Sequence, residues 1–146
     1  MNWSKRGFTQ LELLMVLALM VIVAAISLPR FDRVLEDKKL KNDARQLAWV
    51  LRSARQEVIT TGETHWVIFK IYQRQYNKDN TTYTLSSNIR FVGTTTFGTA
   101  GEMPVCGFTP SGAPIPRAGT VILKNKYGKI ISVVVNVDTG RVRVQE

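Results

Sequence analysis

The stretch that decides the fold is Lys5-Arg6-Gly7-Phe8-Thr9-Gln10-Leu11-Glu12, which opens a long apolar run. Beyond it, Ser27 is the only polar residue between Leu13 and Leu28. As a helix, the segment from Phe8 to Leu28 would be about 31 Å long, which matches a hydrocarbon core of about 30 Å. The two basic residues before this segment favour a cytoplasmic N-terminus and a C-terminal domain outside the membrane.

Glu12 is the residue that a plain membrane anchor does not explain. A carboxylate inside an apolar helix is energetically costly, so it marks a functional position. Cleavage between Gly7 and Phe8 would create an α-amino group four residues before Glu12. The Phe8 amine of one chain could pair with Glu12 of a neighbour and set the register of an assembly. Pairing within one chain is the competing account.

Two other interpretations of this N-terminus remain open. A secretory signal needs small residues after the apolar run, and Ala24-Ala25-Ile26-Ser27 is the nearest candidate. An uncleaved anchor of an export receptor would leave Glu12 without a role.

The segment Lys5–Leu14 resembles the type IV prepilin cleavage and methylation signature. That pattern has glycine before the cut, phenylalanine as the first mature residue and glutamate as the fifth. The resemblance implies that a prepilin peptidase cuts after Gly7 and N-methylates Phe8, and that Phe8 and Glu12 serve assembly. Gln10 departs from the commoner apolar residue at its position.

Pro29 falls where many such proteins also carry proline, and we expect it to kink the helix. Beyond it the pattern predicts an amphipathic helix that packs on a sheet, with charged residues including Glu36 and Asp43 on its surface. Gly62 is the expected C-terminal stop. The apolar stripe comprises Phe31, Val34, Leu35, Leu40, Ala44, Leu47, Ala48, Leu51, Ala54 and Val58.

After Gly62 the pattern alternates, which predicts strands. The segment Gly93–Arg117 is rich in Gly, Pro and Thr and is expected to be mostly loop. The simplest fold is α+β, a long N-terminal helix packed on a C-terminal antiparallel sheet. The predicted strands are Thr64–Tyr72, Thr81–Ser86, Ile89–Gly93, Thr120–Lys124, Lys129–Val137 and Arg141–Gln145.

A second resemblance, to the GspH/FimT group of minor pilins and pseudopilins, covers the C-terminal half. It is carried by Leu51–Arg55, Trp66–Ile71, Phe108–Gly112 and Gly140–Val144. Together the two resemblances imply a leader peptide at 1–7, a transmembrane helix segment at 8–29, an amphipathic helix half at 30–62 and a β-rich domain at 63–146.

Nothing in the sequence predicts an enzyme, a cofactor or a metal site. His65 is the only histidine, and no Cys-x-x-Cys motif or carboxylate cluster stands beside it in the sequence. Cys106 is the only cysteine, so it cannot form a disulfide within the chain, and we interpret it as a small buried apolar residue.

The net charge of +9 favours anionic partners. In the last predicted strand, Arg141 and Arg143 share one face, while Val142 and Val144 take the other. Such arginines can hold phosphates without sequence specificity. In FimT-like pilins a Gly-Arg-x-Arg motif is associated with DNA capture, and Gly140, Arg141 and Arg143 match it. The other basic residues near this strand are Lys124, Lys126 and Lys129.

The resulting hypothesis is a non-enzymatic subunit of a type II secretion pseudopilus or a type IV pilus. Its expected partners are a prepilin peptidase, other pilin or pseudopilin subunits and the inner membrane. It would be inserted in the bacterial inner membrane with its C-terminal domain outside, and then packed into a filament. The alternative is a DNA-binding minor pilin that captures extracellular DNA for natural transformation.

Overall fold

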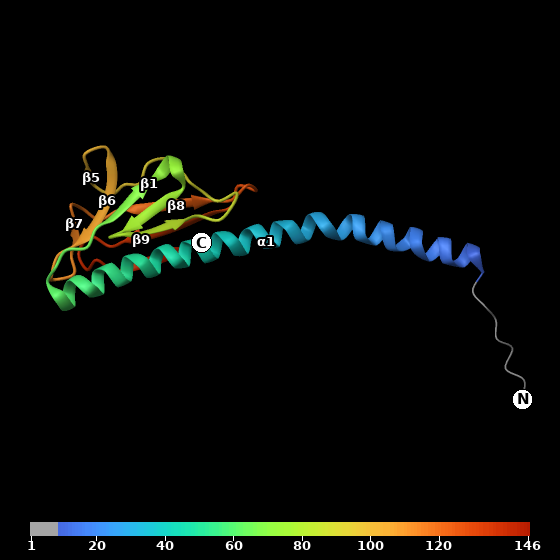
Figure 1. The fold of residues 1–146 in the computed structure, drawn as a ribbon, viewed down its shortest axis with the longest axis horizontal. Coiled ribbons are helices and arrows are strands. Elements are labelled where there is room, and N and C mark those ends of the chain that lie inside the picture. The colour runs from blue at the N-terminus through green and yellow to red at the C-terminus, as the bar shows by residue number, and fades with distance from the viewer. Residues whose placement is uncertain (1–8) are drawn as a thin grey trace, which may run out of the picture. The chain divides into compact units, whose positions relative to one another are not determined.

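The structure is a computed structural model that describes the backbone of residues 9–146 and the side chains of that range except 26–30. Two compact units make up the chain, residues 1–35 and residues 36–146. Helix α1 (Gln10–Thr61) contributes residues to both units (Figure 1). Its C-terminal end is as predicted, because Gly62 follows Thr61 and donates its N–H to the Val58 carbonyl at 2.9 Å.

In the first unit, residues 11–25 of the helix are apolar on every side apart from Glu12. The described side chains of residues 9–25 are all exposed. Among the large apolar side chains of this segment, exposure ranges from 44% at Val16 to 69% at Leu11. Within the part of the chain that the structure describes, no helix is both long and apolar enough to cross a membrane. The transmembrane segment at 8–29 stays a prediction.

The second unit holds an antiparallel six-stranded sheet. Its order is β3-β2-β1-β6-β5, with β7 also paired to β6. Val67 lies opposite Cys106 where β1 meets β6. Residues Ile71–Gln73 form a 3₁₀ turn between β1 and β2. The strands are β1 (Val67–Lys70), β2 (Gln75–Lys78), β3 (Thr81–Thr84), β5 (Thr99–Ala100), β6 (Met103–Phe108) and β7 (Pro114–Ile115).

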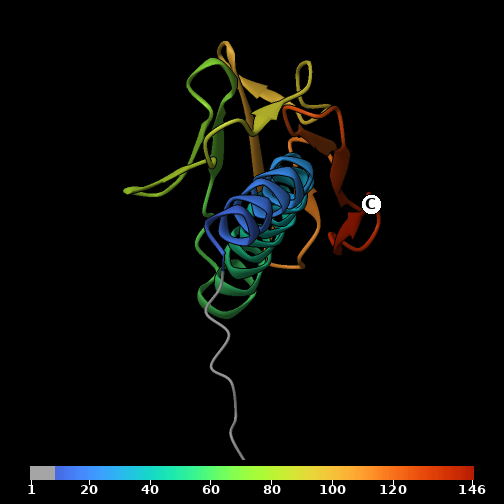
Figure 2. The ribbon, with the colours of Figure 1, turned by 90° about the vertical axis from the view of Figure 1, so that its right-hand side faces the viewer.

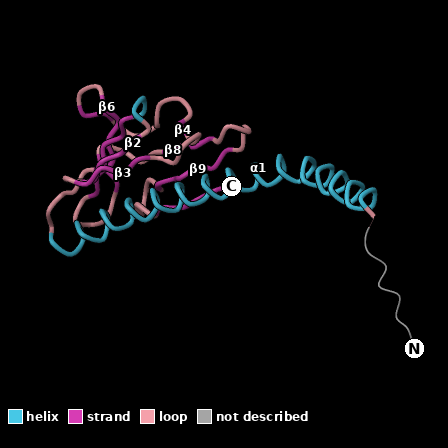
Figure 3. The backbone as a smooth tube through the Cα atoms, turned by 45° about the vertical axis from the view of Figure 1, so that its right-hand side comes forward, coloured by secondary structure: helices cyan, strands magenta, loops and turns pink. Residues whose placement is uncertain are grey.

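A second antiparallel sheet has the order β10-β9-β8-β4. Its strands are β4 (Arg90–Phe91), β8 (Thr120–Lys124), β9 (Ile130–Val135) and β10 (Val142–Gln145). Figure 2 shows the green strands of the first sheet and the red strands of the second on opposite sides of the helix axis. In Figure 3 the strands of residues 36–146 lie along the C-terminal part of α1.

The core of the second unit joins the helix to both sheets. Leu40, Leu47 and Leu51 of α1 are fully buried together with Phe69 and Val133. Phe69 stacks on Phe97, with ring centroids 5.4 Å apart. The alternation of buried and partly exposed residues along β8 and β9 explains why their strands could be read from the sequence.

Several expectations were wrong. The single predicted sheet is two sheets. The segment 93–117 is mostly loop, as predicted, but it also contains β5, β6 and β7, which we did not predict, and β6 pairs with three strands. Strand β2 was not predicted either, because only Tyr76 of its four residues is buried.

The helix also differs from its predicted pattern. Phe31, Val34 and Leu35 are 72%, 53% and 43% exposed, so the packed stripe begins at Leu40. Glu36 and Asp43, which we expected on the surface, are buried at 1% and 5% exposure. Helical spacing alone could not reveal this, because both carboxylates are buried beneath polar groups that come from residues 86–88.

Candidate functional site

Glu12 lies at the N-terminus of α1 and is held there by Thr9. The Thr9 N–H and hydroxyl both donate to Glu12 Oε2 at 2.9 Å, and the Glu12 N–H donates to Thr9 Oγ1 at 3.2 Å. This reciprocal pair is a capping box, which satisfies N–H groups that the helix cannot pair internally. The Thr-x-x-Glu spacing signals it in the sequence, but we did not predict it.

The processing residues cannot be placed in the same way. Gly7 and Phe8 lie outside the described residues. The predicted pair between the Phe8 amine and Glu12 therefore stays a prediction. Pro29 lies in a helical part of the backbone, but its side chain is outside the described set, and its predicted kink also stays a prediction.

The C-terminal strand has the predicted alternation. Arg141 and Arg143 are exposed, whereas Val142 is 4% exposed and belongs to the core. Arg143 pairs in register with Val134 of β9. The backbone carbonyl of Arg141 accepts a hydrogen bond from the Asn136 N–H at 3.0 Å, so Arg141 lies beyond the C-terminal end of β9.

The lysines lie at the other end of β9. Lys124 is in register with Ile130, four residues before Val134, which separates it from Arg143 by about 13 Å along the strand direction. Lys126 follows β8 and lies 5.1 Å from the ring centroid of Tyr127. The five predicted basic residues therefore do not form one cluster.

Lys129 is already paired with the helix. Its ammonium group lies 3.2 Å from Asp37 Oδ2, and Asn125 Nδ2 donates to Asp37 Oδ1 at 2.7 Å. Asn125 Oδ1 in turn accepts the N–H groups of Tyr127 and Lys129. One helical carboxylate thus fixes the β8–β9 turn, which gives Lys129 a structural role.

Gly140 also has a structural role. Its φ is +61°, and a Cβ there would collide with the Gly112 carbonyl oxygen. That same oxygen accepts a hydrogen bond from Arg55 Nε at 3.0 Å. Three segments that carry the GspH/FimT resemblance, 51–55, 108–112 and 140–144, therefore meet at this junction. The geometry explains the glycine of the Gly-Arg-x-Arg motif without DNA.

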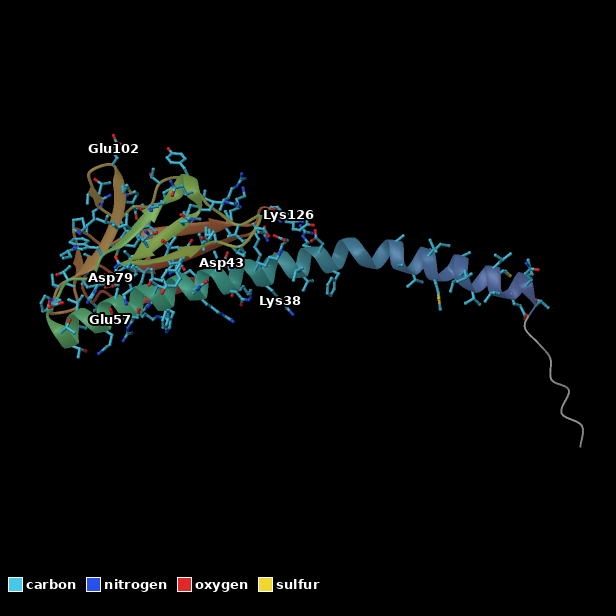
Figure 4. The ribbon with its side chains drawn as sticks, viewed as in Figure 1. Lys38, Asp43, Glu57, Asp79, Glu102 and Lys126 are labelled. Atoms are coloured by element: carbon cyan, nitrogen blue, oxygen red, sulfur yellow. The ribbon has the colours of Figure 1, made fainter. Side chains whose placement is uncertain are left out.

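His65 does have carboxylates nearby, contrary to what its sequence neighbours indicated. Its Nδ1 lies 3.0 Å from Asp79 Oδ1, and its Nε2 lies 3.9 Å from Glu57 Oε2. Figure 4 shows Glu57 near the C-terminal end of α1 and Asp79 in the same region. Lys78 pairs with Glu57. Because this ammonium group already neutralises one of the two carboxylates, we interpret the cluster as a link between α1 and the β2–β3 turn.

Comparison with solved structures shows which known fold this chain has. One structure of the minor pseudopilin EpsH from the type 2 secretion system of Vibrio cholerae has a TM-score of 0.60 and 16% identity, and the match covers 73% of this chain and 96% of that one. A second EpsH structure has a TM-score of 0.57 and 15% identity, with 75% and 94% covered. Neither family models nor the sequences of curated proteins match this chain.

The chain therefore has a pilin-like fold, in which a long helix packs on antiparallel sheets. In particular it has the fold of the minor pseudopilin EpsH, over nearly all of that protein's solved chain. The predicted resemblance to pilin-like proteins is confirmed at the level of the fold.

Proposed function

We propose that this chain is a non-enzymatic minor pseudopilin that assembles into the pseudopilus of a type II secretion system. A prepilin peptidase would cut it after Gly7 and N-methylate Phe8. The helix would hold the chain in the inner membrane until it packs against other pilin-like subunits. Its second unit, residues 36–146, would then lie outside that membrane.

The observation that carries this proposal is the apolar helix of residues 11–25, exposed on all sides around a single carboxylate. Such a helix is stable only when lipid or other helices cover it. The covering must also accommodate Glu12. A Phe8 amine from another copy would meet that carboxylate and favour association in one register. The Thr9 capping box is compatible with this step, because cleavage after Gly7 leaves Thr9 and Glu12 in the chain.

The fold supports the same proposal. The solved structures with this fold are of a minor pseudopilin from a type 2 secretion system. Nothing in the comparisons supports the DNA-capture alternative, and the described structure separates the three lysines on which it depends from the two arginines.

The test uses the protein in its native host. Mass spectrometry of the wild-type protein is expected to show a chain that starts at N-methylated Phe8. A Glu12→Ala variant should be cut normally but be lost from sheared filament fractions, because the buried amine then has no partner. Glu63→Ala, which removes an exposed carboxylate outside the helix, is the matched control. A wild-type chain that starts at Met1 or Asn2, or normal assembly of Glu12→Ala, would refute the proposal.

A further inference from the structure

A groove runs between the exposed face of α1 and strand β10. It has a volume of about 730 Å³, within the range of ligand-binding clefts. We call it the α1–β10 groove. Its lining residues are Arg45, Gln46, Trp49 and Arg52 from the helix and Val144 and Glu146 from the strand end.

The helical wall combines an aromatic ring with two guanidinium groups. Arg45, Trp49 and Arg52 follow at i, i+4 and i+7, so they lie on one face of the helix. Trp49 is 60% exposed, which is unusual for the largest apolar side chain. The acidic group in the groove, Glu146, is paired with Lys41 at 2.7 Å. The Lys41 hydrogen bond lowers the pKa of the Glu146 carboxyl, and the charge of Arg45 adds a smaller effect in the same direction. One carboxylate side chain thus faces Lys41, Arg45 and Arg52, so the groove carries excess positive charge.

The other wall is the free edge of a sheet. Among the described strands, β10 pairs only with β9. The Val142 carbonyl points away from β9, since it accepts a hydrogen bond from Arg52 Nη2 at 3.0 Å. Strand geometry repeats every two residues, so the backbone N–H and C=O of Val144 point the same way, into the groove. An exposed edge of this kind is a template for another extended chain.

We propose that the α1–β10 groove binds an extended segment of a neighbouring subunit that carries alternating carboxylate and apolar side chains. The segment would add to the second sheet beside Val144. Its carboxylates would pair with Arg45 and Arg52, and an apolar side chain would pack on Trp49. The acidic and extended character of the segment follows from the groove. That the segment belongs to a neighbouring subunit rests on the proposed function. A second copy of this chain is disfavoured because its net charge is +9.

The experiment is a fluorescence anisotropy titration of the full chain in detergent. The probe is a labelled ten-residue peptide of alternating glutamate and valine. Two comparison peptides replace glutamate with lysine or carry N-methyl groups on the valines, which blocks backbone pairing. We expect the acidic peptide to bind, the lysine peptide not to bind, and N-methylation to weaken binding by about tenfold or more, because main-chain hydrogen bonds supply the affinity of an added strand.

Variants of the groove residues test whether the peptide binds in the α1–β10 groove. Arg45→Glu/Arg52→Glu should weaken binding by about tenfold or more. Since Arg52 also contacts Val142, Trp49→Ala and Arg45→Glu alone serve as variants that leave that contact intact. Arg74→Glu/Arg90→Glu reverses two exposed charges elsewhere and should bind as the wild type does.

Several outcomes would overturn the inference. They are no binding of the acidic peptide, equal binding by Arg45→Glu and Trp49→Ala, unweakened binding of the N-methylated peptide, or binding of duplex DNA in its place. Each of these outcomes can be told apart from a failure of filament assembly, because the titration needs neither cleavage after Gly7 nor a role for Glu12.

Discussion

At the scale of single residues, Asp43 is a buried carboxylate with a clear partner. Its two oxygens accept the N–H and the hydroxyl of Ser86, each at 2.8 Å. Burial raises the pKa of the Asp43 carboxyl above its ordinary value of 3.8, and the hydrogen bonds from Ser86 oppose that rise. The residue thus ties α1 to the segment that follows β3.

A raised pKa gives Asp43 a defined pH signature. Between about pH 3.8 and the raised pKa, the folded chain binds a proton that the unfolded chain has lost, so the contribution of Asp43 to stability falls as the pH rises. Relative to Asp43→Asn, the wild type should lose free energy of unfolding through this window. Denaturant unfolding at a series of pH values measures the difference. Glu63→Gln is the control, and a difference that grows with pH would contradict the assignment.

Substitution of Gly140 should lower the free energy of unfolding far more than substitution of its neighbour Arg141. Gly140→Ala should lower the free energy of unfolding by about 2–4 kcal/mol, since alanine is strained at positive φ and its Cβ would meet the Gly112 carbonyl. Arg141→Ala should change it by less than about 0.5 kcal/mol, because the side chain is exposed. Chemical denaturation of both variants checks this. Equal losses would mean that the arginine, too, is structural.

At the scale of elements, β6 depends on a close contact with Trp66. A Cβ at Gly107 would lie 2.8 Å from the Trp66 ring, so only glycine leaves room for this ring against the strand. Gly107→Ala should cost about 1–3 kcal/mol. In a Trp66→Ala background the same change should cost much less. A double-mutant cycle by thermal denaturation measures the coupling; simple additivity would show that the clash is not what matters.

A strand with one buried face could be predicted from the alternation of its residues. Strand β8 has the predicted bounds Thr120–Lys124, because its residues alternate between buried and half-buried. Strand β6 was missed because Val105, Cys106, Gly107 and Phe108 are all buried, so no alternation marks it.

The candidate sites could be predicted only where their residues are neighbours in the sequence. The alternating faces of β10 could be predicted from its own residues. The α1–β10 groove, the Asp43–Ser86 pair and the His65 cluster could not, because each joins residues that are distant in sequence. The burial of Cys106 could be predicted, because a lone cysteine is most often a buried residue. It is fully buried, and burial raises the pKa of its thiol to about 12.

At the scale of the whole molecule, residues 36–146 contain every member of the buried core. We therefore expect this fragment to fold without residues 1–35. Its thermal transition, followed by circular dichroism, should be cooperative and should have the midpoint of the full chain in detergent. A broad, non-cooperative transition would show that the first unit contributes to the stability of the second.

The contacts of α1 with the end of the chain also govern how the protein can fold during synthesis. Arg52 bonds to Val142 and Lys41 pairs with Glu146, so the helix meets partners made about ninety or more residues later. The ribosome completes the helix first, yet part of its packing face stays uncovered until the last strand emerges. Premature termination near residue 140 would therefore leave the helix without its last strand and without the partners of Arg52 and Lys41.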